Sequence, residues 1–186
     1  KNAFQDCEST DRKSYNLPFS QNELIEELVA VNPNLVIANI SGNAYAMPWL
    51  KKVPAILHIS YLGTMGGASI ADVISGKVNP SGKLPYSFPV KLSDCSAHSF
   101  GEGAYPGIDT GKEDVSLTDY QRNVGVNPKE EYKDDILVGY RWHDTKKIPA
   151  LFSFGHGLSY TSFKYGKSRL SSKTMDEKGS IKGTVP

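Results

Sequence analysis

Two short apolar runs, at residues 35–38 and 55–59, constrain the fold of this chain more than any other feature. Neither run alternates apolar with polar side chains, and this pattern is typical of strands covered on both faces of a parallel sheet. Helical periodicity lies before the first run, between Ser20 and Asn32, and after the second, over residues 68–74. Helices and strands that alternate along the chain with short connections predict an α/β fold, with a mostly parallel open sheet flanked by helices.

The flanking residues predict where these elements begin and end. Ser20 followed three residues later by Glu23 is a capping box that would start the first helix. Asn32 and Pro33 would end it, and Gly76 would end the second helix. Three further strands are predicted at residues 84–88, 136–142 and 160–164.

Composition excludes several classes of protein. A chain of 186 residues has room for one domain or little more. Its 21 basic and 20 acidic residues give no support for a nucleic-acid partner or an anionic membrane surface. No apolar stretch reaches the roughly 20 residues of a membrane-spanning helix. The four histidines lack metal-site spacing, and Cys7 and Cys95 favour free thiols over a disulfide framework, with their pairing left open.

Residues 93–129 break the α/β pattern. This stretch is rich in Gly, Asp, Ser and Tyr and shows no period. Loops of this length are usually functional or disordered. A nucleotide site is disfavoured because the glycines at 76–82 and 101–107 have the wrong spacing for a phosphate-binding loop.

Short strings spread over most of the chain carry a more specific signal. They are CESTDR at 7–12, LP at 17–18, QNELI at 21–25, NPN at 32–34, SG at 41–42, MPW at 47–49, IADVISG at 70–76, NPSGKLP at 79–85, VGYR at 138–141 and FGHGLSYTSF at 154–163. In this order they resemble the C-terminal part of family 3 glycoside hydrolases of the β-glucosidase or β-xylosidase type. By residue chemistry alone, the first string is more simply a solvated loop.

The resemblance implies a domain plan. Residues 1–162 would form part of the family's C-terminal α/β sandwich, and residues 163–186 would begin a fibronectin type III-like module. The chain would then be a fragment of a larger enzyme, poorly soluble or marginally stable by itself. Such enzymes also contain an N-terminal barrel domain, which would be this chain's partner within the same polypeptide.

The resemblance also implies site residues. Glu8 occupies the position of the general acid/base, although Ser9 stands where the family pattern has Gly. Glu102 is a second candidate for this role. Asp11 and Arg12 are candidate substrate contacts from the same motif. Three aromatic residues of the long loop can either stack on sugar rings or pin the loop to the domain: Phe100, Tyr105 and Tyr120.

A retaining glycosidase needs two carboxyl groups about 5–5.5 Å apart, one as nucleophile and one as proton donor. The family takes its nucleophilic Asp from the barrel, so this chain alone is expected to be inactive. The expected function is that of an exo-acting β-glucosidase without cofactor or metal, secreted or periplasmic, with β-linked glycosides as substrates and a homodimer left open. The alternatives are a β-xylosidase, a non-catalytic carbohydrate-binding or scaffolding module of the same fold and, least favoured, a flavodoxin-like binding domain.

Overall fold

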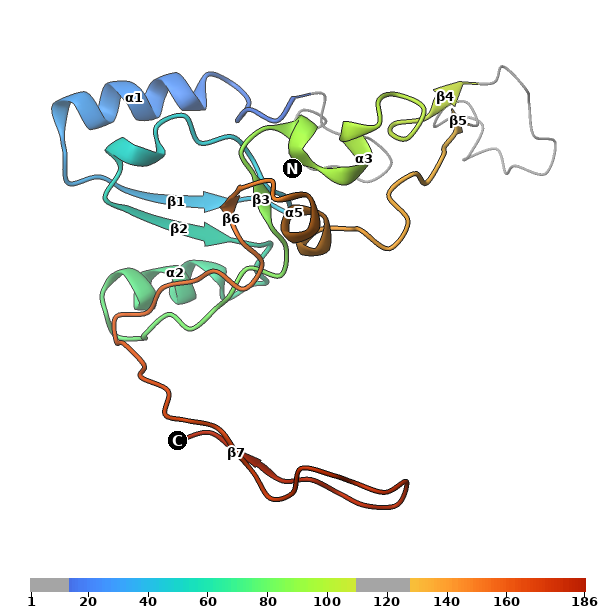
Figure 1. The fold of residues 1–186 in the computed structure, drawn as a ribbon. Coiled ribbons are helices and arrows are strands. Elements are labelled where there is room, and N and C mark those ends of the chain that lie inside the picture. Colours follow the sequence, from blue (N-terminus) through green and yellow to red (C-terminus); the bar gives the residue numbers. More distant parts are fainter. Residues whose placement is uncertain (1–13, 110–127) are drawn as a thin grey trace.

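The computed structural model describes residues 14–109 and 128–186, and Figure 1 shows how its elements are arranged. The helices are α1 (Gln21–Val31), α2 (Gly66–Ile74), α3 (Ser96–Ser99) and α5 (Tyr140–Lys146), with short 3-10 helices η1 (Leu50–Lys52) and η2 (Leu92–Asp94). The strands are β1 (Val36–Ile40), β2 (Ala55–Ile59), β3 (Phe88–Pro89), β4 (Ile108–Asp109), β5 (Pro128–Lys129), β6 (Ala150–Phe152), β7 (Arg169–Leu170) and β8 (Gly183–Thr184).

The two apolar runs form the parallel pair β1 and β2, as predicted, and α1 and α2 lie on opposite sides of it (Figure 1). Ile37 and Ile56 are partners in the register and face the core. The prediction that both faces are covered is wrong for β1, since Val36 and Ile40 remain half exposed. The other described strand pairs, β3–β6, β4–β5 and β7–β8, are antiparallel, so a mostly parallel sheet is not what the described residues form.

Helix α1 ends at Asn32 as predicted, but its start differs from the predicted capping box. Ser20 adopts a left-handed backbone conformation with φ 53°, and its hydroxyl makes no capping hydrogen bond. A capping side chain requires an extended backbone at this position, which Ser20 does not have. The helix is held instead by buried Ile25 and by Asn22, whose side-chain oxygen accepts a hydrogen bond from the Trp49 indole at 2.9 Å.

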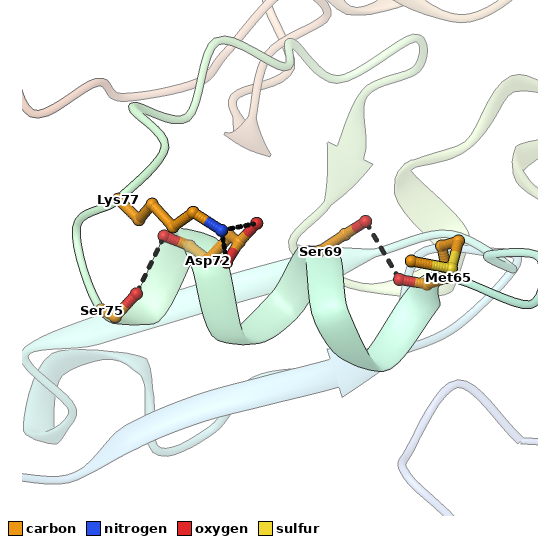
Figure 2. A network of polar contacts seen from close by, with 5 residues as sticks. All are labelled: Met65, Ser69, Asp72, Ser75 and Lys77. Atoms are coloured by element: carbon orange, nitrogen blue, oxygen red, sulfur yellow. Dashed lines mark hydrogen bonds and ion pairs between the residues drawn. The ribbon is translucent and has the colours of Figure 1, made fainter.

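Helix α2 ends at Gly76, as predicted, where a positive φ of 77° suits glycine. Polar contacts link residues of this helix to one another and to the residues that directly follow it (Figure 2). Ser69 donates to the Met65 carbonyl, and Lys77 pairs with the Asp72 carboxylate at 3.0 Å. Exposed ion pairs of this kind contribute little to stability, and no residue of the helix is fully buried.

Two of the strings that carry the resemblance, at residues 79–85 and 154–163, lie side by side. The Leu84 N–H donates to the His156 carbonyl and the Gly155 N–H to the Leu84 carbonyl, both at 2.8 Å. Asn79 accepts a hydrogen bond from the Tyr160 N–H at 2.8 Å. Gly157 fits closely here, because an added Cβ would overlap the Gly82 carbonyl oxygen. The predicted strand at 84–88 is accordingly reduced to β3, which pairs with β6.

Seven buried side chains form the core between α1, the parallel pair and β3: Leu17, Ile25, Tyr45, Met47, Trp49, Val53 and Phe88. Trp49, Tyr45 and Phe88 are fully buried. Leu17 belongs to the LP string and Met47 and Trp49 to the MPW string, so these strings are largely structural.

The predicted strand at 136–142 is wrong. The chain turns at residues 135–137, and Gly139, with a φ of 61°, leads directly into α5. The Trp142 side chain on this helix is buried, whereas Tyr140 remains partly exposed. The apolar residues 136–138 favoured a strand locally, but the backbone reversal at Gly139 and the burial of Trp142 favour a helix.

The C-terminal residues form a thin hairpin, β7–β8, away from the core (Figure 1). The predicted strand at 160–164 is absent, and β7 and β8 have two residues each. The fold class is therefore confirmed as mixed α/β, whereas the hairpin alone does not establish a fibronectin type III-like module.

Candidate functional site

The structure places three of the seven candidate site residues. Phe100, Glu102 and Tyr105 lie on the turn that joins α3 to β4. The remaining four, which are Glu8, Asp11, Arg12 and Tyr120, lie outside the described residues.

Local hydrogen bonds shape the turn that carries these three residues. Gly101 has a φ of 80°, and its carbonyl accepts hydrogen bonds from the N–H groups of Ala104 and Tyr105. Upstream, the hydroxyl of buried Ser96 donates to the Asp134 carboxylate at 3.0 Å. Downstream, Ile108 pairs with Lys129 in the β4–β5 ladder. The turn is therefore tied to the domain on both sides.

Phe100 rests against the body of the domain. Its ring centroid lies 5.4 Å from that of Trp142, in an edge-on arrangement at 63°. The Trp142 indole donates to the Asp94 carbonyl at 3.1 Å and so ties α5 to η2. Phe100 keeps 37% of its surface exposed, so it both pins the loop and leaves part of a ring available to a ligand.

Tyr105 makes a comparable contact. Its ring lies 4.9 Å from the ring of His98 on α3, at an angle of 73°. Sequence reasoning did not single out His98, because no local pattern predicts this contact. Both rings are half-buried.

Glu102 has an exposed side chain, and its main-chain carbonyl accepts a hydrogen bond from the Gly107 N–H at 2.8 Å. Within residues 14–109 and 128–186, its carboxylate has no recorded hydrogen bond or ion pair. A catalytic acid usually sits in a desolvated site beside another charge, which holds its proton until it is needed. The described surroundings of Glu102 offer neither.

The chain that follows the CESTDR string is firmly held. The Tyr15 hydroxyl donates to the Pro89 carbonyl at 2.8 Å, and the Tyr15 carbonyl accepts from the Ala46 N–H at 2.8 Å. Pro89 ends β3 and lies three residues before η2, which leads into α3. The structure therefore joins the exit of the first string to the base of the loop that carries Phe100. Sequence reasoning missed Tyr15, because nothing local predicts a contact between residues 74 positions apart.

In the described part of the loop, the Cys95 thiol is not activated. Burial, and to a lesser degree the nearby Asp94 carboxylate, raise the pKa of the Cys95 thiol, which favours the unreactive protonated form. Cys95 has no disulfide partner within the described residues. No group of three or more His, Cys, Asp or Glu side chains in that part of the chain could hold a metal ion. Likewise, none of its helices is long and apolar enough to cross a membrane.

Residues 1–160 match the glycosyl hydrolase family 3 C-terminal domain. The chain is a member of glycosyl hydrolase family 3. This confirms the family that the strings indicated.

Known members support the assignment at the level of sequence and fold. The chain is 55% identical to the β-glucosidase BoGH3A of Bacteroides ovatus over 185 residues, covering all of the chain and 22% of that protein. It is 40% identical to thermostable β-glucosidase B of Acetivibrio thermocellus over 182 residues, 97% of the chain and 21% of that protein. The family 3 chain therefore spans about a fifth of the length of these curated relatives.

Among solved structures, the fold resembles DesR, a β-glucosidase from Streptomyces venezuelae solved in complex with D-glucose. The TM-score is 0.77 at 35% identity, over 95% of this chain and 20% of that one. A β-glucosidase from Bifidobacterium adolescentis gives a TM-score of 0.73 at 30% identity, over 90% of this chain and 22% of that one. The α/β arrangement described above is thus the fold of this family domain.

Proposed function

We propose that this family 3 chain supplies the general acid/base, Glu8, and one wall of the sugar site in a retaining β-glucosidase. The observation that carries the proposal is the 55% identity, over the whole chain, to a protein named as a β-glucosidase. The CESTDR string adds the acid/base candidate, because Glu8 stands at the Glu position of the family pattern.

The anchoring of Tyr15 supports a site at this place in the fold. The chain that leaves the CESTDR string is fixed to the Pro89 carbonyl. The loop of Phe100 and Tyr105 begins a few residues beyond Pro89. A carboxylate on one segment and aromatic rings on the other are the groups that a glycosidase uses for proton transfer and for stacking on a sugar.

The nucleophile would come from another part of the enzyme. In the proposed mechanism, that carboxylate attacks the anomeric carbon while Glu8 protonates the departing glycosidic oxygen. Glu8 then removes a proton from water as the water hydrolyses the glycosyl-enzyme. Each carboxyl group therefore changes its role once per cycle, and the anomeric configuration is retained. Glu102 remains the second candidate for the acid, with its exposed position as the argument against it.

Within the enzyme, residues 1–162 would belong to the α/β domain and residues 163–186 would begin a fibronectin type III-like module. The N-terminal barrel of the same polypeptide would be the partner of this domain, and secretion or export to the periplasm is the proposed localisation. A β-xylosidase is the second candidate function, because the barrel supplies most of the contacts to the sugar in such an enzyme.

The test uses the full-length polypeptide that contains this chain. With an aryl β-glucoside as substrate, time-resolved proton NMR should show the β-anomer of glucose as the first product. The same enzyme should have a higher kcat/KM for the aryl β-glucoside than for the matched β-xyloside. An α-anomer as first product would refute the retaining mechanism, and a reversed preference would favour the xylosidase.

A further inference from the structure

Three buried polar atoms have no hydrogen-bond partner within residues 14–109 and 128–186: Asn39 Oδ1, Tyr45 Oη and His58 Nδ1. Tyr45 is fully buried, with 0% of its surface exposed. Buried polar atoms in folded proteins are nearly always paired, either with protein or with ordered water. These three atoms therefore need an explanation.

The three side chains come from neighbouring positions. Asn39 and His58 are register partners on the parallel strands β1 and β2, so they project from the same face of the pair. Their face also carries Ile37 and Ile56, which pack on the core. The Tyr45 ring lies 5.8 Å from the His58 ring, centroid to centroid. The three side chains are thus neighbours through His58, and we call them the 39–45–58 cluster.

We propose that the 39–45–58 cluster binds one ordered internal water molecule, which fastens the loop of residues 41–49 to the ends of β1 and β2. Asn39 and His58 are the penultimate residues of their strands, and Tyr45 lies in the loop above them. The water is the ligand that satisfies all three atoms together.

The donors and acceptors balance. His58 Nε2 lies 2.9 Å from the Tyr86 hydroxyl oxygen. If Nε2 carries the proton and donates to that oxygen, Nδ1 has a free lone pair. The water then donates its two protons to Asn39 Oδ1 and His58 Nδ1 and accepts one from the Tyr45 hydroxyl. It makes three hydrogen bonds, the usual number for a buried water.

The walls of the site favour water over an ion. The three ligands are neutral, and the cluster contains neither a carboxylate nor a thiolate that could offset the charge of a cation. Phe88 closes one side, with its ring 5.2 Å from His58 and 5.6 Å from Tyr45. Burial lowers the pKa of His58 and raises that of Tyr45, and both effects favour the neutral forms that the balance above requires.

The variant Tyr45→Phe tests the inference through the sign of its effect on stability. If the hydroxyl donates to a water, removing it loses a hydrogen bond, and the thermal midpoint of this domain within the full-length polypeptide should fall by about 2–4 °C. If the hydroxyl is truly orphaned, removing it relieves a desolvation cost, and the midpoint should rise or stay unchanged. The matched control is Tyr132→Phe, whose side chain is 86% exposed and which should leave the midpoint unchanged.

A second measurement does not depend on a variant. A high-resolution crystal structure of a protein containing this chain should show a water within about 3.2 Å of all three atoms. In NMR spectra of the His58 ring nitrogens, the proton should be on Nε2. A dry cluster, three side chains bonded directly to one another, or a proton on Nδ1 would overturn the proposal.

Discussion

Replacing Phe88 by alanine should test the described core directly. Phe88 is 1% exposed, and its ring lies beside four other rings. The ring centroids lie 5.6 Å away for Tyr45, 5.2 Å for His58, 5.6 Å for Tyr86 and 5.9 Å for Phe152. Truncation would leave a cavity where the parallel pair, the 41–49 loop and the β3–β6 ladder meet.

The expected loss follows from known core truncations. A buried Phe→Ala change costs about 3–5 kcal/mol, from lost burial and the unfilled cavity. For a chain of this size, each kcal/mol moves the thermal midpoint by about 2–4 °C, so the midpoint should fall by about 6–20 °C. Urea unfolding followed by tryptophan fluorescence gives the free energy directly, since Trp49 packs in the same core.

The matched control is Phe163→Ala, which removes the same atoms from a side chain that is 72% exposed. It should change the free energy of unfolding by less than about 0.5 kcal/mol. A loss below about 1 kcal/mol for Phe88→Ala would refute the proposed core. If the alanine variant does not fold, Phe88→Leu keeps most of the apolar contact and should show a smaller loss of the same sign.

Three further predictions concern pH, backbone packing and activity. Burial lowers the pKa of His58 below its ordinary value of 6.5, so the unfolded chain binds the proton more readily. The contribution of neutral His58 to the free energy of unfolding should therefore be fully present above pH 6.5. It should be lost as the pH drops from there toward the lowered pKa. Urea midpoints should show this slope, and His58→Gln should reduce it. Gly157→Ala should cost about 1–3 kcal/mol in urea unfolding because its Cβ meets the Gly82 carbonyl, whereas Gly82→Ala, which has open space, should cost less. The purified 186-residue chain should not hydrolyse an aryl β-glucoside, and native-like turnover would contradict its dependence on a nucleophile from elsewhere.

Sequence patterns correctly predicted those helices and strands that depend on neighbouring residues alone. The apolar runs at 35–38 and 55–59 correspond to β1 and β2, and Gly76 ends α2 because its left-handed backbone suits glycine. The prediction of a capping box was wrong because the role of Ser20 depends on its backbone conformation, which the residue type does not determine. The predicted strand at 136–142 was wrong because the positive φ of Gly139 and the burial of Trp142 override the strand preference of the preceding apolar residues.

For the candidate site, too, the sequence predicted local features but not contacts between distant residues. The composition of residues 93–129 indicated a loop that is functional or disordered, and the strings indicated the family, which the comparison confirmed. The contacts that hold the site are non-local: Tyr15 with Pro89, and Phe100 with Trp142. Periodicity and spacing carry no information about pairs this far apart in the sequence, so these anchors became visible only in the folded chain.

The central claim is that Glu8 is the general acid/base, and leaving-group dependence tests it most directly. In the full-length enzyme, Glu8→Gln should lower kcat/KM for an alkyl β-glucoside by about 10²–10⁴-fold, because that leaving group needs a proton. For a dinitrophenyl β-glucoside, whose leaving group departs unprotonated, kcat/KM should change far less. Glu102→Gln and Glu130→Gln, as matched controls, should show no such difference between the two substrates. An equal loss on both substrates for Glu8→Gln, or the selective loss appearing in Glu102→Gln instead, would contradict the assignment.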